Sequence, residues 1–143
     1  MRVVVQRVKE AAVSIGGIER VSIGKGFLLL VGIGKSDTPE TIERMAGKIS
    51  RLRIFEDEQG KMNLDIRQVA GEILSVSQFT LLGNTSKGNR PGFDDAADPV
   101  FAKELWEGFN DALIKEGVSL KAGEFGARME IGLVNDGPVT FIL

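Results

Sequence analysis

Apolar residues recur along most of the chain with the spacing of β-strands. Runs rich in valine, isoleucine and leucine, bounded by glycine pairs and polar turns, are typical of strands that contribute to a core. The run that begins at Ile73 has apolar residues on both alternating faces, which favours a strand covered on both sides. The strands predicted in this way are residues 1–9, 11–15, 18–23, 26–33, 53–56, 73–82, 118–122 and 129–134.

The stretch 39–52 has helical spacing instead, because its apolar residues recur at intervals of three or four and form one face. Asp37 or Thr38 is the expected N-cap, and Pro39 lies in the first turn, where its missing N–H is tolerated. Charged residues occupy the opposite face, which we interpret as solvent-exposed.

A second helix is expected to begin with Asp98 as its N-cap and Pro99 as its first residue, and to end at Gly117. Its apolar face is wide enough to cover a sheet. Strands mixed with two helices in a chain of 143 residues predict a single α+β domain that spans residues 1–143.

Polar side chains interrupt the apolar run at 73–82. If the strand alternates regularly, Gln78 and Thr80 share one face, while Ser77 and Phe79 lie on the other. Buried polar groups need hydrogen-bond partners, and a turn signal follows directly, so this cluster is expected at a strand end that opens onto a loop. Two interpretations stay open. Either neighbouring backbone satisfies these side chains, which spacing alone favours, or they form part of a site.

The loop that follows, over residues 83–95, is polar, and Lys87 and Arg90 are its only cations. Long loops inside compact domains are commonly functional or disordered. A loop that contacts phosphate and an ordinary surface loop are therefore equal alternatives.

Near the end of the chain, Gly137 and Pro138 interrupt a run of β-forming residues. Proline cannot donate to a ladder, so the polar residues around it predict an exposed turn that joins two strands. Arg7 lies among the valines of the first strand and is expected as a charge at the rim of the sheet.

Composition restricts the chemistry. The chain has no cysteine, histidine or tyrosine, which excludes a Ser-His-Asp triad, a Cys-His pair and His-ligated zinc. Any catalysis must use carboxylates, lysine, hydroxyls, amides, backbone N–H groups or the substrate itself. No clustered acidic pattern argues for a magnesium site, so neither a metal nor a cofactor is expected.

The formal net charge of −2 does not favour a protein that grips a long duplex, so any nucleic acid partner should be contacted over a short piece only. No apolar run approaches membrane-spanning length, and the first residues lack an extended apolar signal region. A cytoplasmic protein without membrane contact is expected.

Three stretches, taken together and in this order, resemble the D-aminoacyl-tRNA deacylases. The resemblance extends from the first residue to the last strand, and the loop segment 87–91 is also similar to the family. The three stretches are Met1-Arg2-Val3-Val4-Val5-Gln6-Arg7-Val8, Ser77-Gln78-Phe79-Thr80-Leu81 and Asn135-Asp136-Gly137-Pro138-Val139-Thr140.

The resemblance implies a homodimer of β-barrel-like α+β subunits with two covering helices. It also implies hydrolysis of the ester between a D-amino acid and the 3′ adenosine of tRNA, with glycine mischarged on tRNA as a further candidate substrate. No metal, cofactor or DNA partner is expected.

The resemblance also assigns roles to residues. Ser77, Gln78, Phe79 and Thr80 line the pocket of one subunit, and Gly137 and Pro138, joined by a cis peptide bond, enter from the other subunit. Arg7 resembles the arginine that holds this Gly-Pro segment in place. Lys87 and Arg90 become the candidates for contact with tRNA phosphates.

An aminoacyl ester is an activated acyl donor, so its hydrolysis needs positioning and N–H donors more than a histidine base. Backbone N–H groups near Phe79 and Thr80, or the Gln78 amide, are the candidate donors. Thr80 is a weak nucleophile without a base, so we favour attack by water, assisted by the ribose 2′-OH of the substrate. Thr80 then has a positioning role.

The alternative function is a non-catalytic dimeric module that binds RNA ends, and a dimeric scaffold is a third interpretation.

Overall fold

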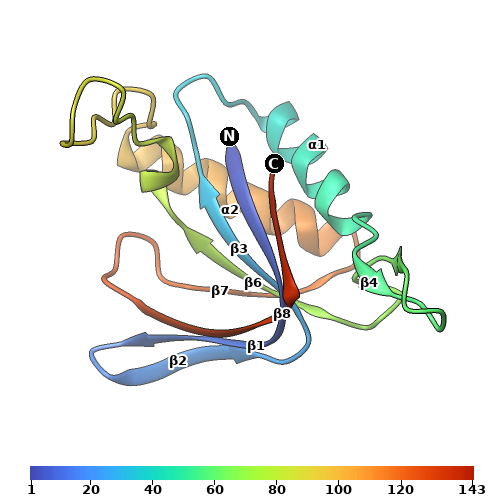
Figure 1. Ribbon diagram of the computed structural model, residues 1–143. Coiled ribbons are helices and arrows are strands. Elements are labelled where there is room, and N and C mark those ends of the chain that lie inside the picture. The colour runs from blue at the N-terminus through green and yellow to red at the C-terminus, as the bar shows by residue number, and fades with distance from the viewer.

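The computed structural model describes residues 1–143. A mixed sheet of six strands curves into a barrel-like shape, and two α-helices cover one of its faces (Figure 1). This confirms the expected fold class. The sheet contains β1 (Arg2–Ile15), β2 (Ile18–Ile23), β3 (Gly26–Gly32), β6 (Glu72–Ser77), β7 (Ser119–Ala122) and β8 (Glu130–Ile142), and a small second sheet contains β4 (Phe55–Glu56) and β5 (Met62–Leu64).

Strand β1 organises the sheet. One of its edges pairs with β3 over Arg2 to Val8 and then with β2 over Ala11 to Ile15, while the other edge pairs with β8. All three pairings are antiparallel, whereas β3, β6 and β7 are mutually parallel. The two strands expected at 1–9 and 11–15 are therefore one long strand that changes partner.

The core has two layers, one on each face of the sheet. Phe27, Leu29 and Ile73 face the helices, whereas Leu28 and Leu74 point into the barrel. The apolar residues on both faces of β3 and β6 are thus explained by burial on both sides, as expected for the run that begins at Ile73.

Both helices begin where the sequence predicts. In α1 (Pro39–Ser50), the Thr38 hydroxyl accepts a hydrogen bond from the Thr41 N–H, and in α2 (Pro99–Lys115) the Asp98 carboxylate accepts from two N–H groups of the first turn. Asp37, the other candidate cap, is buried and accepts from the Gly34 N–H at 2.6 Å. Neither helix is both long enough and apolar enough to cross a membrane.

The strand expected to reach residue 82 is wrong, because β6 ends at Ser77 and a 3-10 helix, η1 (Phe79–Leu82), follows. The β3–β6 ladder stops with the pair of Val31 and Ser77, and β3 itself ends one residue later. Without a partner strand the chain turns, so Gln78 and Thr80 do not share a strand face.

The turn expected between two strands at Gly137 and Pro138 is also wrong, because β8 is continuous. Gln6 pairs with Thr140 and Val8 pairs with Asn135, so Arg7 alone faces residues 136–139. We call residues 136–139 the Gly-Pro bulge. A bulge accommodates a proline that cannot donate to the ladder, and the Gly137–Pro138 peptide bond is cis, as the resemblance implied.

Candidate active site

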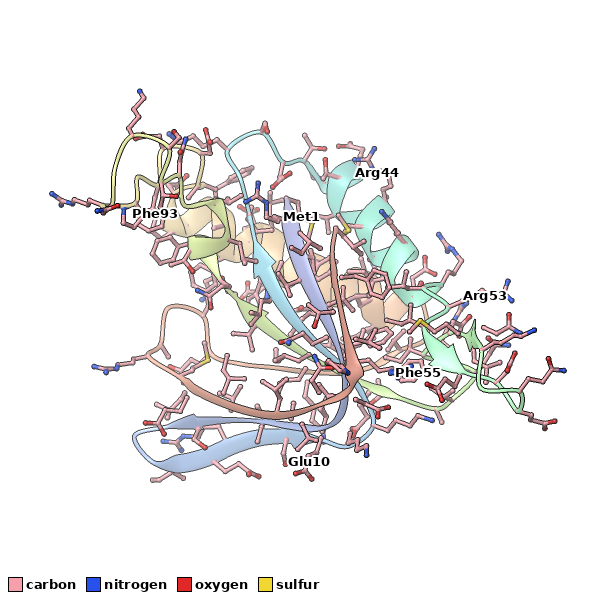
Figure 2. All side chains as sticks on the ribbon, viewed as in Figure 1. Met1, Glu10, Arg44, Arg53, Phe55 and Phe93 are labelled. Atoms are coloured by element: carbon pink, nitrogen blue, oxygen red, sulfur yellow. The ribbon has the colours of Figure 1, made fainter.

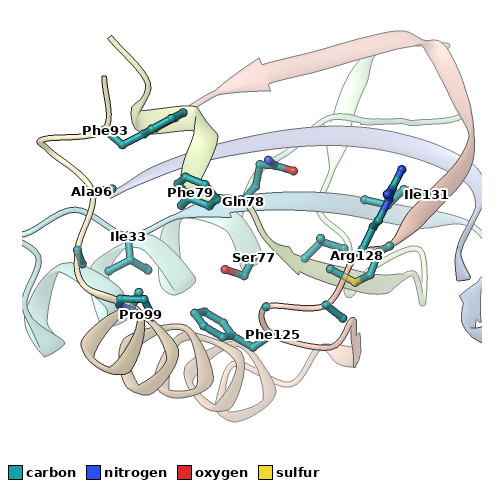
Figure 3. Close-up of a pocket in the computed structure, with 16 residues that line it drawn as sticks. Ile33, Ser77, Gln78, Phe79, Phe93, Ala96, Pro99, Phe125, Arg128 and Ile131 are labelled. Carbon is teal, nitrogen blue, oxygen red and sulfur yellow. The ribbon is translucent and has the colours of Figure 1, made fainter. Parts of the chain in front are cut away.

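A pocket of about 660 Å³ opens at the carboxyl end of β6, between η1, the start of α2 and the connection from β7 to β8 (Figure 3). Its lining is mostly apolar, and Arg128 is the only charged residue in it. Three of the predicted site residues, Ser77, Gln78 and Phe79, contribute to this lining. The pocket therefore suits a largely apolar group with a few polar atoms.

Thr80 lies beside this pocket rather than in its lining. It is exposed, and its hydroxyl accepts a hydrogen bond from Nε2 of Gln78. The Gln78 N–H donates to the Val31 carbonyl at 2.7 Å, which ties the start of η1 to β3. The structure thus places Ser77, Gln78 and Phe79 in the lining of the pocket and Thr80 beside it.

Two residues that sequence reasoning did not single out hold η1 in place. Nη1 of Arg2 donates to the Leu81 carbonyl at 2.5 Å. Gly32 lies opposite Arg2 in the ladder, and a Cβ at Gly32 would lie 3.1 Å from the Gln78 carbonyl oxygen and 3.2 Å from the Leu81 Cβ. The absent side chain at Gly32 therefore lets η1 approach the end of β3 closely.

Aromatic residues complete the walls of the pocket. The ring of Phe93, labelled in Figures 2 and 3, packs edge-on against Phe79 with the centroids 5.0 Å apart. On the opposite wall, Phe125 contacts the ring of Trp106 at 5.8 Å, and Nε1 of Trp106 donates to the buried Ser75 hydroxyl at 3.0 Å. No periodic pattern predicts Phe125, because it lies in a connection and reaches the pocket only through the fold.

Arg7 is not a rim charge, since only 3% of it is exposed. Its Nη1 donates to the Ile54 carbonyl at 2.6 Å, and its Nε donates to the Asp136 carbonyl at 3.0 Å, while Nη2 lies 3.4 Å from a carboxylate oxygen of Glu56. Arg7 therefore contacts the first residue of the Gly-Pro bulge through the Asp136 carbonyl.

Gly137 has a backbone conformation that favours glycine, with φ of +131°. A Cβ there would lie 2.6 Å from Cγ2 of Val139 and 3.1 Å from Nη2 of Arg7. Both Gly137 and Pro138 are exposed, and neither contributes to the lining of the pocket in the same chain. Within one chain, the structure does not bring the Gly-Pro bulge and residues 77–80 together.

The polar loop is closed by a bridge between Asn84 and Gly92. Lys87 and Arg90 are exposed, and neither takes part in an ion pair within the chain. The structure groups no three acidic side chains into a cluster that could hold a metal ion. The site thus offers hydroxyls, an amide, backbone N–H groups and nearby cations.

Comparison with known proteins gives matches along almost the whole chain. The family described as D-Tyr-tRNA(Tyr) deacylase matches residues 4–143. A D-aminoacyl-tRNA deacylase of Lactobacillus acidophilus is 57% identical over 143 residues, which cover 100% of this chain and 99% of that protein. A D-aminoacyl-tRNA deacylase of Staphylococcus carnosus is 53% identical over 142 residues, which cover 99% and 94%.

Among solved structures, one named c-Myc DNA Unwinding Element Binding Protein superposes with a TM-score of 0.94 at 42% identity. The match covers 100% of this chain and 97% of that one. The likeness therefore extends over the complete barrel, both helices and η1. The sequence match over residues 4–143 and this likeness in fold lead to the same conclusion. The chain belongs to the D-Tyr-tRNA(Tyr) deacylase family.

Proposed function

We propose that this chain is a D-aminoacyl-tRNA deacylase, a hydrolase that cleaves the ester between a D-amino acid and the 3′ adenosine of tRNA. The observation that carries the proposal is the position of residues 77–79 in the lining of the apolar pocket, with Thr80 beside it. Family membership over residues 4–143 and the names of the relatives support the same activity.

Water, and not Thr80, is the proposed nucleophile. The Thr80 hydroxyl accepts from the Gln78 amide, which draws electron density from its oxygen, and the pocket lining contains no side chain that could act as a base. The ribose 2′-OH of the substrate assists the water, and Thr80 positions the ester. The N–H groups of Phe79 and Thr80 begin η1 and have no partner within that helix, so they are the proposed donors to the developing oxyanion.

The active protein is a homodimer in this proposal, formed through β8. That strand pairs only with β1, and several apolar side chains along it are exposed, which is typical of an interface. These side chains are Leu133 (37% exposed), Val134 (45%), Phe141 (37%) and Ile142 (73%).

The order of features along β8 supports a site shared between two subunits. Ile131 lines the pocket, and the Gly-Pro bulge lies a few residues further along the same strand. A two-fold axis near Val134 would exchange these positions, so that the bulge of one subunit meets the pocket of the other. Gly137 and Pro138 then complete the site in trans.

The Gly-Pro bulge is the proposed element that rejects L-amino acids. The two enantiomers carry the same groups, so attractive contacts alone discriminate poorly between them, and a rigid repulsive element is needed. Support from Arg7 and the absence of a side chain at Gly137 give the bulge this character. The bulge would contact the backbone atoms of the substrate and make few contacts with the amino-acid side chain. Many D-amino acids, and glycine, would therefore be accepted as substrates.

Lys87 and Arg90 are proposed to contact phosphates near the acceptor end of the tRNA. A net charge of −2 is compatible with a partner held only at that end, whereas a long duplex such as DNA is not proposed as a partner. Since aminoacyl-tRNA is used in translation, we propose the cytoplasm as the location.

Incubation of the protein with D-Tyr-tRNA tests the proposed activity. We expect free D-tyrosine to be released in repeated turnovers. Binding of the charged tRNA without release of the amino acid would contradict the proposal and favour the alternative, a non-catalytic module that binds RNA ends.

A further inference from the structure

The side chain of Asn135 bridges the two ends of the Gly-Pro bulge. Its Oδ1 accepts from the Val139 N–H at 2.7 Å, and its Nδ2 donates to the Thr140 hydroxyl oxygen at 3.1 Å. Asn135 is the last residue that pairs with β1 before the bulge, and Thr140 is the first that pairs after it. One carboxamide therefore fixes the distance between the two points where the bulge leaves and rejoins the sheet.

Thr140 connects this bridge to the neighbouring strand. Its hydroxyl oxygen lies 3.5 Å from Nε2 of Gln6, the residue with which it pairs in the ladder. The oxygen thus accepts from amides on two strands. Together with the hydrogen bond from Arg7 to the Asp136 carbonyl, it holds the bulge from two sides.

The ladder cannot supply these contacts. Arg7 is the only β1 residue opposite the bulge. Strand β1 therefore has too few carbonyls in register to accept a hydrogen bond from each N–H of residues 136–139. Val139 is buried, and an N–H without an acceptor in such a place costs free energy. An asparagine at 135 has an acceptor for the Val139 N–H and a donor for Thr140, a combination that neither alanine nor valine offers.

We propose that Asn135 and Thr140 are positioning residues that set the preference for D- over L-aminoacyl substrates by fixing the Gly-Pro bulge. Neither residue belongs to the pocket lining, so each acts through Gly137 and Pro138 and not by contact with the ester. The proposal rests on the proposed deacylase function and on the role of the bulge in rejecting L-amino acids.

The test compares Asn135→Ala, Thr140→Val and Thr140→Ser with the parent. Each protein is assayed under single-turnover conditions on D-Tyr-tRNA and L-Tyr-tRNA, and hydrogen exchange of the Val139 N–H is measured in the absence of substrate. Ser14→Ala is the matched control, because Ser14 lies in the same β1–β8 ladder, outside the bulge.

We expect Asn135→Ala to lower the ratio of D to L rates by about tenfold and to accelerate Val139 exchange by a similar factor, as for the loss of one or two hydrogen bonds. Thr140→Val should lower the ratio by less, and Thr140→Ser should retain the parent ratio because it keeps the hydroxyl. Ser14→Ala should leave both readouts unchanged.

A ratio that stays at the parent value in both Asn135→Ala and Thr140→Val would overturn the proposal. Unchanged Val139 exchange in Asn135→Ala would also overturn it, since the bridge would then not hold the bulge. A parent protein that hydrolyses neither substrate would overturn the proposed function instead, and the exchange measurement would still decide whether the Asn135 bridge exists. If Asn135→Ala does not fold, Thr140→Val decides the outcome.

Discussion

At the scale of residues, the chain has no histidine that could activate the Thr80 hydroxyl. Its hydroxyl accepts from the Gln78 amide, and the lining of the pocket beside it contains no carboxylate or histidine. A hydroxyl in this state can accept, donate and orient, but it is a poor nucleophile. In the proposed mechanism, activation of the attacking water therefore comes from the 2′-OH of the substrate.

The first prediction is that Thr80→Ala folds normally and keeps reduced activity on D-aminoacyl-tRNA. The side chain is exposed, so the melting temperature should change little, while loss of a positioning hydroxyl should slow hydrolysis by about 10- to 100-fold. Melting curves and single-turnover rates measure the two effects. Complete loss of activity together with a trapped acyl-enzyme in the parent would identify Thr80 as the nucleophile.

Full-rate hydrolysis of a substrate ending in 2′-deoxyadenosine would contradict assistance by the 2′-OH.

Residues with local signals are predictable from sequence, and residues with distant partners are not. Thr38 and Asp98 cap their own helices, so a few neighbouring residues reveal them. The acceptors of Arg7, in contrast, lie far away in the sequence. The Ile54 carbonyl is 47 positions from Arg7 and the Asp136 carbonyl is 129 positions from it. Nothing near Arg7 in the sequence indicates that its guanidinium is buried.

At the scale of elements, two of the wrong predictions, those for residues 73–82 and 129–142, have one cause. The hydrophobic pattern of 73–82 fits a longer strand, and the pattern of 129–142 fits two strands, but pairing decides the outcome in both places. β6 stops where its partner β3 stops, and β8 continues because β1 accommodates a bulge. Period-2 alternation describes one strand and carries no information about the length of its neighbour.

The second prediction concerns Glu72, which links the start of β6 to two other strands. Its carboxylate accepts from the Gly24 N–H at 3.1 Å and lies 3.3 Å from the Lys121 ammonium, which also donates to the Ser22 carbonyl of β2. The hydrogen bond from Gly24 is the main reason that the pKa of Glu72 is lowered from 4.5, and Lys121 lowers it further against the opposing effect of burial.

Because the folded-state pKa is lowered, ionised Glu72 stabilises the fold above the unfolded value of 4.5, and this stabilisation is lost as the pH falls through the folded pKa. Glu72→Gln should therefore melt at a lower temperature than the parent at neutral pH, and the difference should shrink in acid. The effect should be about 1 kcal/mol or less, since both side chains of the pair are partly exposed. Glu19→Gln, an exposed carboxylate on β2, is the control. A constant difference across the whole pH range would refute this role.

The third prediction concerns the loop over 83–95. Replacing Lys87 and Arg90 together by glutamine should weaken binding of charged tRNA and flatten its salt dependence, because fewer counterions are released. The melting temperature should barely move, since exposed charges contribute little to stability. Replacing Arg44 and Lys48, which are exposed on α1, makes the same change in charge and should leave binding unaffected. Equal affinity of the two double variants at low and moderate salt would assign the loop to the ordinary surface.

At the scale of the whole molecule, the fourth prediction is a dimer in solution, with a mass about twice the 15.5 kDa of one chain. Val134→Glu should dissociate it, because two carboxylates would meet near the proposed axis, and activity should fall with it. Val100→Glu, at an 80% exposed apolar position on α2, is the matched control and should remain dimeric. Light scattering measures the mass. A monomeric parent with full activity would exclude a site completed in trans.

The pocket itself is a property of the whole molecule, which limits its prediction from sequence. The end of an apolar run marks Ser77 and Gln78 as a polar cluster at a strand end, but only the resemblance to a family assigns them, and the motif around Gly137, to a site. Phe125 and Arg128, in contrast, come from the β7–β8 connection and reach the mouth only when the sheet has curved. Local pattern does not contain that curvature.

The fifth prediction is tested by one paired measurement, the release of amino acid from D-Tyr-tRNA and L-Tyr-tRNA made on the same tRNA. Both are assayed at equal protein concentration under single-turnover conditions. We expect D-tyrosine to be released rapidly and L-tyrosine to remain esterified over the same period, because the pocket orients the ester and a fixed bulge excludes one enantiomer. Equal rates on the two substrates, or binding of both without release, would contradict a chirality-selective deacylase.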